Sequence, residues 1–141
     1  MGKINIGRVI LGGIVAGVVA DLLDYPIDSV WLAPGWAYDM SLLGHTTFSS
    51  SMWIEFDVLG IVGGIVAIWL YAAIRPRFGA GLPTAIRAGV VVWILATLVP
   101  NVSFMCVAGL FSRHLALYTT LGGLVEIVVG TIAGAALYKE A

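Results

Sequence analysis

Apolar residues dominate the chain in four long stretches, and the segments between and beside these stretches hold most of the charged residues. Each stretch is close to the roughly 20 residues that cross about 30 Å of hydrocarbon as a helix. Lipid offers the backbone no hydrogen-bond partner, so an open-ended chain crosses it as helices. The predicted spans cover residues 9–32, 53–74, 88–111 and 115–138. We therefore expect an all-α membrane protein, with four transmembrane helices in a compact bundle that makes residues 1–141 a single transmembrane domain.

The connections between the spans differ in length and composition. Residues 33–52 form a predicted outer loop, and Pro34-Gly35 at its start should end the first helix. Residues 75–87 form the predicted cytoplasmic loop. Pro100 removes a backbone hydrogen bond near the middle of the third span, which predicts a kink there.

Lysine and arginine residues lie almost entirely on one side of the predicted spans. Arg113 alone falls on the side of the outer loop. The other six fall on the opposite side: Lys3, Arg8, Arg75, Arg77, Arg87 and Lys139. Because basic residues accumulate in cytoplasmic loops, this pattern predicts an N-in/C-in orientation, with both termini in the cytoplasm.

The overall composition supports a lipid-facing surface. The chain is 60% hydrophobic and only 11% charged, whereas soluble domains carry about a quarter charged residues. The net charge of -1, without a basic patch, excludes nucleic acid as a partner. Cys106 is the only cysteine, so an intrachain disulfide is excluded as well.

Glycines four residues apart mark candidate helix-packing faces, because they let helix backbones approach closely. The pairs are Gly13 and Gly17, Gly60 and Gly64, and Gly130 and Gly134. On each of these helices the helical period puts a carboxylate on the same face, and these are Asp21, Asp57 and Glu126. We expect the three carboxylates to point into the bundle.

Acidic residues are concentrated in the outer half of the predicted bundle. Asp21, Asp24 and Asp28 lie within about 60° of arc on an ideal helix, and Glu126 lies roughly 16 Å deep in the fourth span. A charged carboxylate at that depth costs at least about 2.5 to 3.5 kcal/mol, so Glu126 should be protonated, paired or bound to a cation. The functional hypothesis is a proton or cation site formed by Asp21, Asp24, Asp57, Glu126 and His114.

A structural interpretation of the same residues stays open. Asp24 and Asp28 would then sit in water at the membrane interface, with Pro26 distorting the helix between them. Glu126 would be a neutral acid that donates one hydrogen bond to Asn101 or to a backbone carbonyl. Carboxylates and imidazole suit several divalent metals, but no fixed ligand spacing is present, so neither a metal nor a cofactor is predicted.

Catalytic motifs are not evident in the sequence. His45 and His114 lie in loops or at predicted helix ends, which disfavours a haem held between facing helices. No Gly-x-Ser-x-Gly motif occurs. An enzyme acting on a lipid would have to use the outer acidic patch together with the two histidines.

Three segments resemble a known family: residues 7–13, 69–79 and 121–140. The most specific is the run from Trp69 to Gly79, which reads WLYAAIRPRFG. These segments are similar to an uncharacterised family of small bacterial four-helix integral membrane proteins. The resemblance implies a location in the bacterial inner membrane and a four-helix topology, and it transfers no catalytic or binding residues.

Three functions remain in competition. The small size and the missing catalytic motif favour a non-enzymatic module, either an accessory subunit of a larger membrane complex or a homo-oligomer packed through its glycine faces. Its partners would be membrane lipids and other membrane subunits or further copies of the chain. The alternatives are a proton or cation binding and transport unit that uses the intramembrane carboxylates, and a membrane enzyme acting on a lipid.

Overall fold

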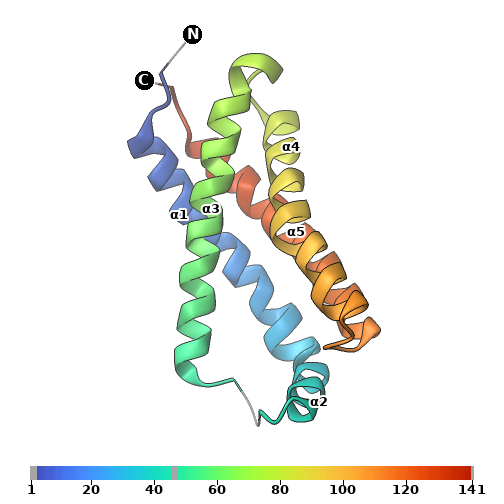
Figure 1. The fold of residues 1–141 in the computed structure, drawn as a ribbon. Coiled ribbons are helices and arrows are strands. Elements are labelled where there is room, and N and C mark those ends of the chain that lie inside the picture. The colour runs from blue at the N-terminus through green and yellow to red at the C-terminus, as the bar shows by residue number, and fades with distance from the viewer. Residues whose placement is uncertain (1–2, 46–47, 141) are drawn as a thin grey trace.

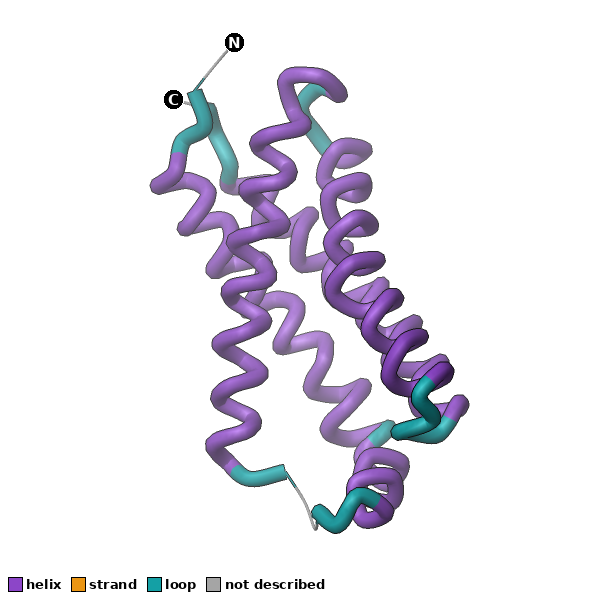
Figure 2. Tube along the Cα trace, viewed as in Figure 1, coloured by secondary structure: helices purple, strands orange, loops and turns teal. Residues whose placement is uncertain are grey.

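The structure, a computed structural model, describes residues 3–45 and 48–140. The described part of the chain has an all-helical fold, with five α-helices and no strand (Figures 1 and 2). The α-helices are α1 (Ile6–Asp24), α2 (Ala33–Leu42), α3 (Ser50–Phe78), α4 (Leu82–Trp93) and α5 (Arg113–Leu137). Three π-helical segments continue or connect them: η1 (Tyr25–Trp31), η2 (Ile94–Leu98) and η3 (Asn101–Val107).

Four of the resulting helical stretches are long and apolar enough to cross a membrane. They are Ile6–Trp31, Ser50–Phe78, Leu82–Val107 and Arg113–Leu137. Large apolar side chains are exposed along all four, which suits a surface in contact with lipid. The prediction of an all-helical chain with four long apolar helices is confirmed for the described residues.

Polar side chains at the helix starts explain where three of these helices begin. The side chain of Asn5 accepts a hydrogen bond from the Arg8 N–H at 3.1 Å, just before α1. Ser49 and Ser112 serve the same role before α3 and α5. Each of these oxygens pairs with a backbone donor that the first helical turn leaves free.

The connections differ from the sequence prediction at both ends of the molecule. Residues 33–52, expected to be a loop, contain α2, because Pro34 falls in the first helical turn, where its missing N–H is not needed. Residues 75–87, expected to be the opposite loop, are also largely helical. There α3 continues past Pro76 to Phe78 and ends at Gly79, whose φ of 83° suits glycine.

Proline residues coincide with the irregular parts of two spans. Pro26 lies in η1, at the end of the first span. Pro100 lies between η2 and η3, so the irregularity predicted in the third span takes the form of two π-helical segments. A proline leaves one carbonyl without its helical donor, and π-helical turns are one way to absorb that loss.

Helix α1 crosses α3 and also packs on α5 (Figure 1). At the crossing with α3, a Cβ added to Gly13, Gly17 or Gly64 would overlap the backbone of the other helix. On the other side, Gly130 and Gly134 lie against backbone carbonyl oxygens of α1. The glycines therefore allow close backbone approach within this one chain.

Polar contacts close the molecule at both ends. Both chain termini lie at one end and α2 lies at the other (Figure 1). The terminal end is closed by a hydrogen bond from the Asn5 N–H to the Tyr138 hydroxyl, 3.3 Å, and by an ion pair between Arg75 and Glu140, 3.5 Å. At the α2 end, the buried carboxylate of Asp39 accepts a hydrogen bond from the Ser112 N–H at 2.7 Å.

Two apolar clusters form the core. One joins the terminal halves of the helices around Ile68 and Ala88, both fully buried. The other joins η1, η3 and the start of α5 around Leu32 and Leu115.

Candidate functional site

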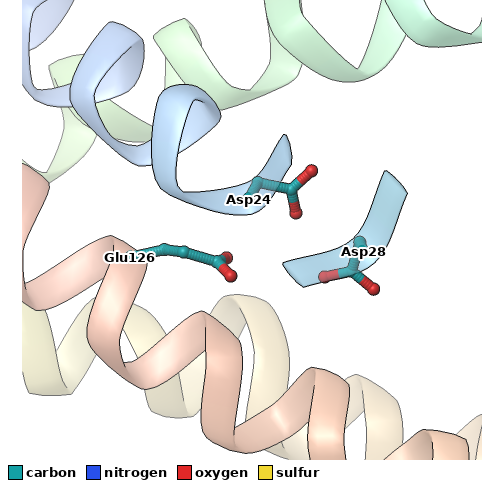
Figure 3. Close-up of side chains that lie close together, drawn as sticks. All are labelled: Asp24, Asp28 and Glu126. Atoms are coloured by element: carbon teal, nitrogen blue, oxygen red, sulfur yellow. The ribbon is translucent and has the colours of Figure 1, made fainter. Parts of the chain in front are cut away.

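Three carboxylates from two helical stretches meet at one point. Asp24 is the last residue of α1, Asp28 follows in η1, and Glu126 lies near the middle of α5. Each residue has a carboxylate oxygen, and these oxygens all lie within 4.8 Å of one another. Figure 3 shows Glu126 extending from α5 toward Asp24 and Asp28. The close contact of Gly130 with the α1 carbonyl of Ala16 brings this face of α5 against α1.

The three carboxylates line a cavity of about 570 Å³. Its walls come from α1, η1, α2, α3, α4, η2 and α5 and from the segments just before α3 and α5, and they include two further acids, Asp21 and Asp57. No lysine, arginine or histidine is among the described residues that line it. We refer to this space as the acidic cavity.

Glu126 is the most buried of the five acids. Its residue is only 7% exposed, and Oε1 has no hydrogen-bond partner among the described residues. Arg75 Nη1 is the other buried side-chain atom of the described chain without a hydrogen bond, but it lies 3.5 Å from the Glu140 carboxylate. A buried carboxyl oxygen without donor or cation is energetically costly, so Glu126 needs a proton or a cation.

The side chain of Asn101, one expected partner of Glu126, is engaged elsewhere. Its Nδ2 donates to the hydroxyls of Thr119 and Thr120, at 3.3 and 2.9 Å. In the described part of the chain no hydrogen bond joins Asn101 to Glu126. The amide instead fastens the irregular third span to α5.

Asp21 and Asp28 are each held by a neighbouring element. Trp36 on α2 donates its indole N–H to Asp28 Oδ1 at 2.7 Å, which orients that carboxylate. Asp21 reaches over Gly60 on α3, where any Cβ would collide with the carboxylate. Helices α2 and α3 thus help to position acids that belong to the first span.

Four of the five residues proposed for a proton or cation site line the acidic cavity, namely Asp21, Asp24, Asp57 and Glu126. His114 does not. It is exposed at the start of α5, with its ring 4.5 Å from that of Tyr118. Twelve residues separate it from Glu126, about 18 Å along the helix. Asp28, which the sequence analysis left at the interface, takes its place beside Asp24 and Glu126.

Sequence reasoning also missed an aromatic cluster in the cavity wall. Its members are Trp36, Phe48, Trp53, Phe56 and Phe111. Their rings lie 5.2 to 6.0 Å apart along the chain of contacts that joins them. Part of the signal was available, since Trp53, Phe56, Gly60 and Gly64 recur at helical spacing on the face that carries Asp57.

Searches against protein-family models, curated proteins and solved structures give no match to this chain. The chemistry of the site is therefore interpreted from its own geometry. Oxygen ligands suit protons, alkali and alkaline-earth ions and ammonium groups. Three converging carboxylates, with no lysine, arginine or histidine in the described cavity wall, could hold a proton or a cation.

Proposed function

We propose that this chain is an integral membrane protein that binds a cation in the acidic cavity, and that Glu126 exchanges a proton for it. The observation that carries the proposal is the buried carboxyl group of Glu126, which meets Asp24 and Asp28 in a cavity lined by five acids and whose Oε1 has no hydrogen-bond partner among the described residues. A carboxylate that is buried without a partner is rare unless it has a functional role.

Electrostatics supports this proposal over a purely structural role for the acids. Several ionised carboxylates within a few ångströms repel one another, and the repulsion is stronger where water is scarce. The described wall offers no basic side chain to offset it. Protons neutralise the cavity when it is empty, and a cation replaces at least one of them when it is occupied.

The proposal includes an orientation in the membrane. The six basic residues near the terminal end favour an N-in/C-in topology by the positive-inside rule. The acidic cavity would then lie toward the outer half of the bilayer, on the side of α2. The family resemblance adds the expectation that this membrane is a bacterial inner membrane.

The accessory-subunit or homo-oligomer hypothesis stays a prediction, but one of its motivations is weaker. Gly13, Gly17, Gly64, Gly130 and Gly134 all pack against backbone within the chain, and Gly60 makes room for Asp21. They are therefore not available as a glycine face for another subunit. Purification from the native membrane in mild detergent tests the hypothesis, because an obligate subunit retains its partner.

A hydrophobic carbodiimide tests the proposed function directly. Dicyclohexylcarbodiimide adds to a protonated carboxyl group in an apolar environment and leaves a stable N-acylurea, with no group lost. We expect peptide mass spectrometry to find the adduct on Glu126. Cations that enter the cavity should slow the labelling, and Na⁺, Ca²⁺ and tetramethylammonium are the first to try.

Two variants control this measurement. Glu126→Gln removes the reactive carboxyl and should abolish that adduct. Glu55→Gln removes an exposed acid of α3 that does not line the cavity, and it should label as the wild type does. Labelling of Glu126 that no inorganic or organic cation slows, at any concentration the protein tolerates, would contradict a cation site.

A further inference from the structure

We infer that the cation bound in the acidic cavity is an organic ammonium ion with an aromatic or bulky apolar body. This inference rests on the proposed function and names the class of its ligand. The structural basis is that a tryptophan, Trp36, connects the carboxylate group to the aromatic cluster. The cavity therefore has a charged part and an apolar part side by side.

The contacts of Trp36 define this arrangement. Its indole N–H donates to Asp28 at 2.7 Å, which places one edge of the ring at the carboxylates. The same ring lies edge-on to Phe48 and Phe111, with centroids 5.9 and 5.5 Å away. Phe48 in turn contacts Trp53 and Phe56 at 5.2 and 6.0 Å. Ammonium groups bind both carboxylates and aromatic faces.

The three carboxylates alone could hold a metal ion, but the size of the whole cavity favours an organic ion. A calcium ion needs six to eight oxygens at about 2.3–2.6 Å, which closes the protein or water tightly around it. A volume of about 570 Å³ is instead typical of sites for small organic molecules, roughly 300–1,000 Å³. Apolar and aromatic walls with a few converging polar groups are the usual lining of such sites.

Exposed wall residues indicate how such a ligand enters. Phe56 and Leu59 of α3 and Ala96 of η2 line the cavity and are exposed residues. The cavity is therefore open to its surroundings along α3 and η2. Amphipathic amines concentrate at the membrane interface, so they would reach this opening from the lipid.

The test compares four ligands in calorimetric titrations of the full-length protein in detergent. Benzyltrimethylammonium carries both the charge and the aromatic body, and neopentylbenzene is its neutral isostere. Tetramethylammonium carries the charge alone, and Ca²⁺ represents inorganic cations. We expect saturable binding of benzyltrimethylammonium, with an affinity at least about tenfold higher than that of tetramethylammonium. The reason is that its aromatic ring adds contacts to those of the charged group. The neutral isostere should not bind saturably.

Two variants separate the two parts of the cavity. Glu126→Gln should weaken both ammonium ions, and Asp24→Asn gives an independent check if the first variant folds poorly. Trp53→Leu should weaken benzyltrimethylammonium several-fold and leave tetramethylammonium unchanged. Trp69→Leu, which alters an exposed tryptophan outside the cavity, is the matched control and should change neither.

An ammonium group can come from a free amine or from a lipid headgroup, and nanodiscs distinguish these sources. Competition with benzyltrimethylammonium by phosphatidylethanolamine, but not by phosphatidylglycerol, identifies the lipid. Equal affinity in both lipids identifies a free amine. Glu126-dependent binding of Ca²⁺ without binding of benzyltrimethylammonium, or equal binding of the neutral isostere, would overturn the organic ammonium ligand. If no cation binds in a way that depends on Glu126, the proposed function is overturned as well.

Discussion

Glu126 on α5 and Asp24 at the end of α1 face each other with carboxylate oxygens within 4.8 Å. The two residues come from opposite ends of the chain, and glycines at the helix crossings make their approach possible. Gly130, four residues after Glu126, lies on the α1 carbonyl of Ala16 with no room for a Cβ. The acids of the cavity thus lie next to a close contact between the backbones of α1 and α5.

The neighbours Gly63 and Gly64 provide a matched test of that packing. A Cβ at Gly64 would overlap the backbone of Gly13 and Gly17, whereas a Cβ at Gly63 meets nothing within 4 Å. We expect Gly64→Ala to lower the free energy of unfolding by about 1–3 kcal/mol through overpacking. Gly63→Ala should be neutral or stabilising by up to about 1 kcal/mol, from helix propensity. Equal unfolding midpoints in detergent would contradict the crossing described above.

Asp39 fastens α2 to the start of α5 and gives a second stability test. Asp39 is buried, and its Oδ2 accepts from the Ser112 N–H at 2.7 Å. Asp39→Ala should cost about 1.5–3 kcal/mol, because a hydrogen bond to a charged group is lost. Asp39→Asn keeps an acceptor oxygen and should lose less. Hydrogen exchange at the Ser112 amide should be fast in the alanine variant alone, and slow exchange in both would show that Asp39 is dispensable.

The fold could be predicted from the sequence further than the site could. Four apolar helices follow from composition and length, and the shared faces of Gly17 with Asp21 and of Gly130 with Glu126 follow from the helical period. The helix α2 was missed because Pro34-Gly35 resembles a helix breaker, although proline is tolerated in a first turn. Because α2 was not predicted, the hydrogen bond from Trp36 to Asp28 could not be expected from the sequence pattern.

The structure places His114 outside the acidic cavity, apart from the carboxylates with which the sequence analysis grouped it. An imidazole beside many carboxylates suggested a shared site, but depth along α5 decides which side chains meet. Asp28 shows the converse case. Its spacing from Asp24 put both on one face, while its place near the end of the span suggested water; the structure has it in the cavity wall instead.

The hydrogen bond from Trp36 to Asp28 predicts that a variant without it binds cations more weakly. The indole N–H stabilises the ionised carboxylate, which is the form that attracts a cation. Trp36→Phe keeps the ring but removes the donor, so cation affinity should fall by about tenfold, which corresponds to roughly 1.4 kcal/mol. Trp69→Phe, at an exposed tryptophan outside the cavity, is the control. Unchanged affinity in Trp36→Phe would mean that Asp28 takes no part in binding.

The proposed orientation can be tested with single cysteines in a Cys106→Ser background. Ser49→Cys lies at the α2 end and Lys139→Cys at the terminal end. By the positive-inside rule, a membrane-impermeant maleimide should label position 49 in intact cells and position 139 only after permeabilisation. The reverse pattern would place the acidic cavity on the cytoplasmic side.

Proton release on cation binding is the most direct test of the exchange at Glu126. The cation that binds most tightly in calorimetry is added to lightly buffered protein in detergent, and the pH change is recorded. We expect the wild type to release about one proton more per bound cation than Glu126→Gln, because ligand cation and proton compete for one carboxylate. For the same reason, affinity should fall as the pH is lowered. Cation binding without proton release, or equal release by the two proteins, would contradict the exchange.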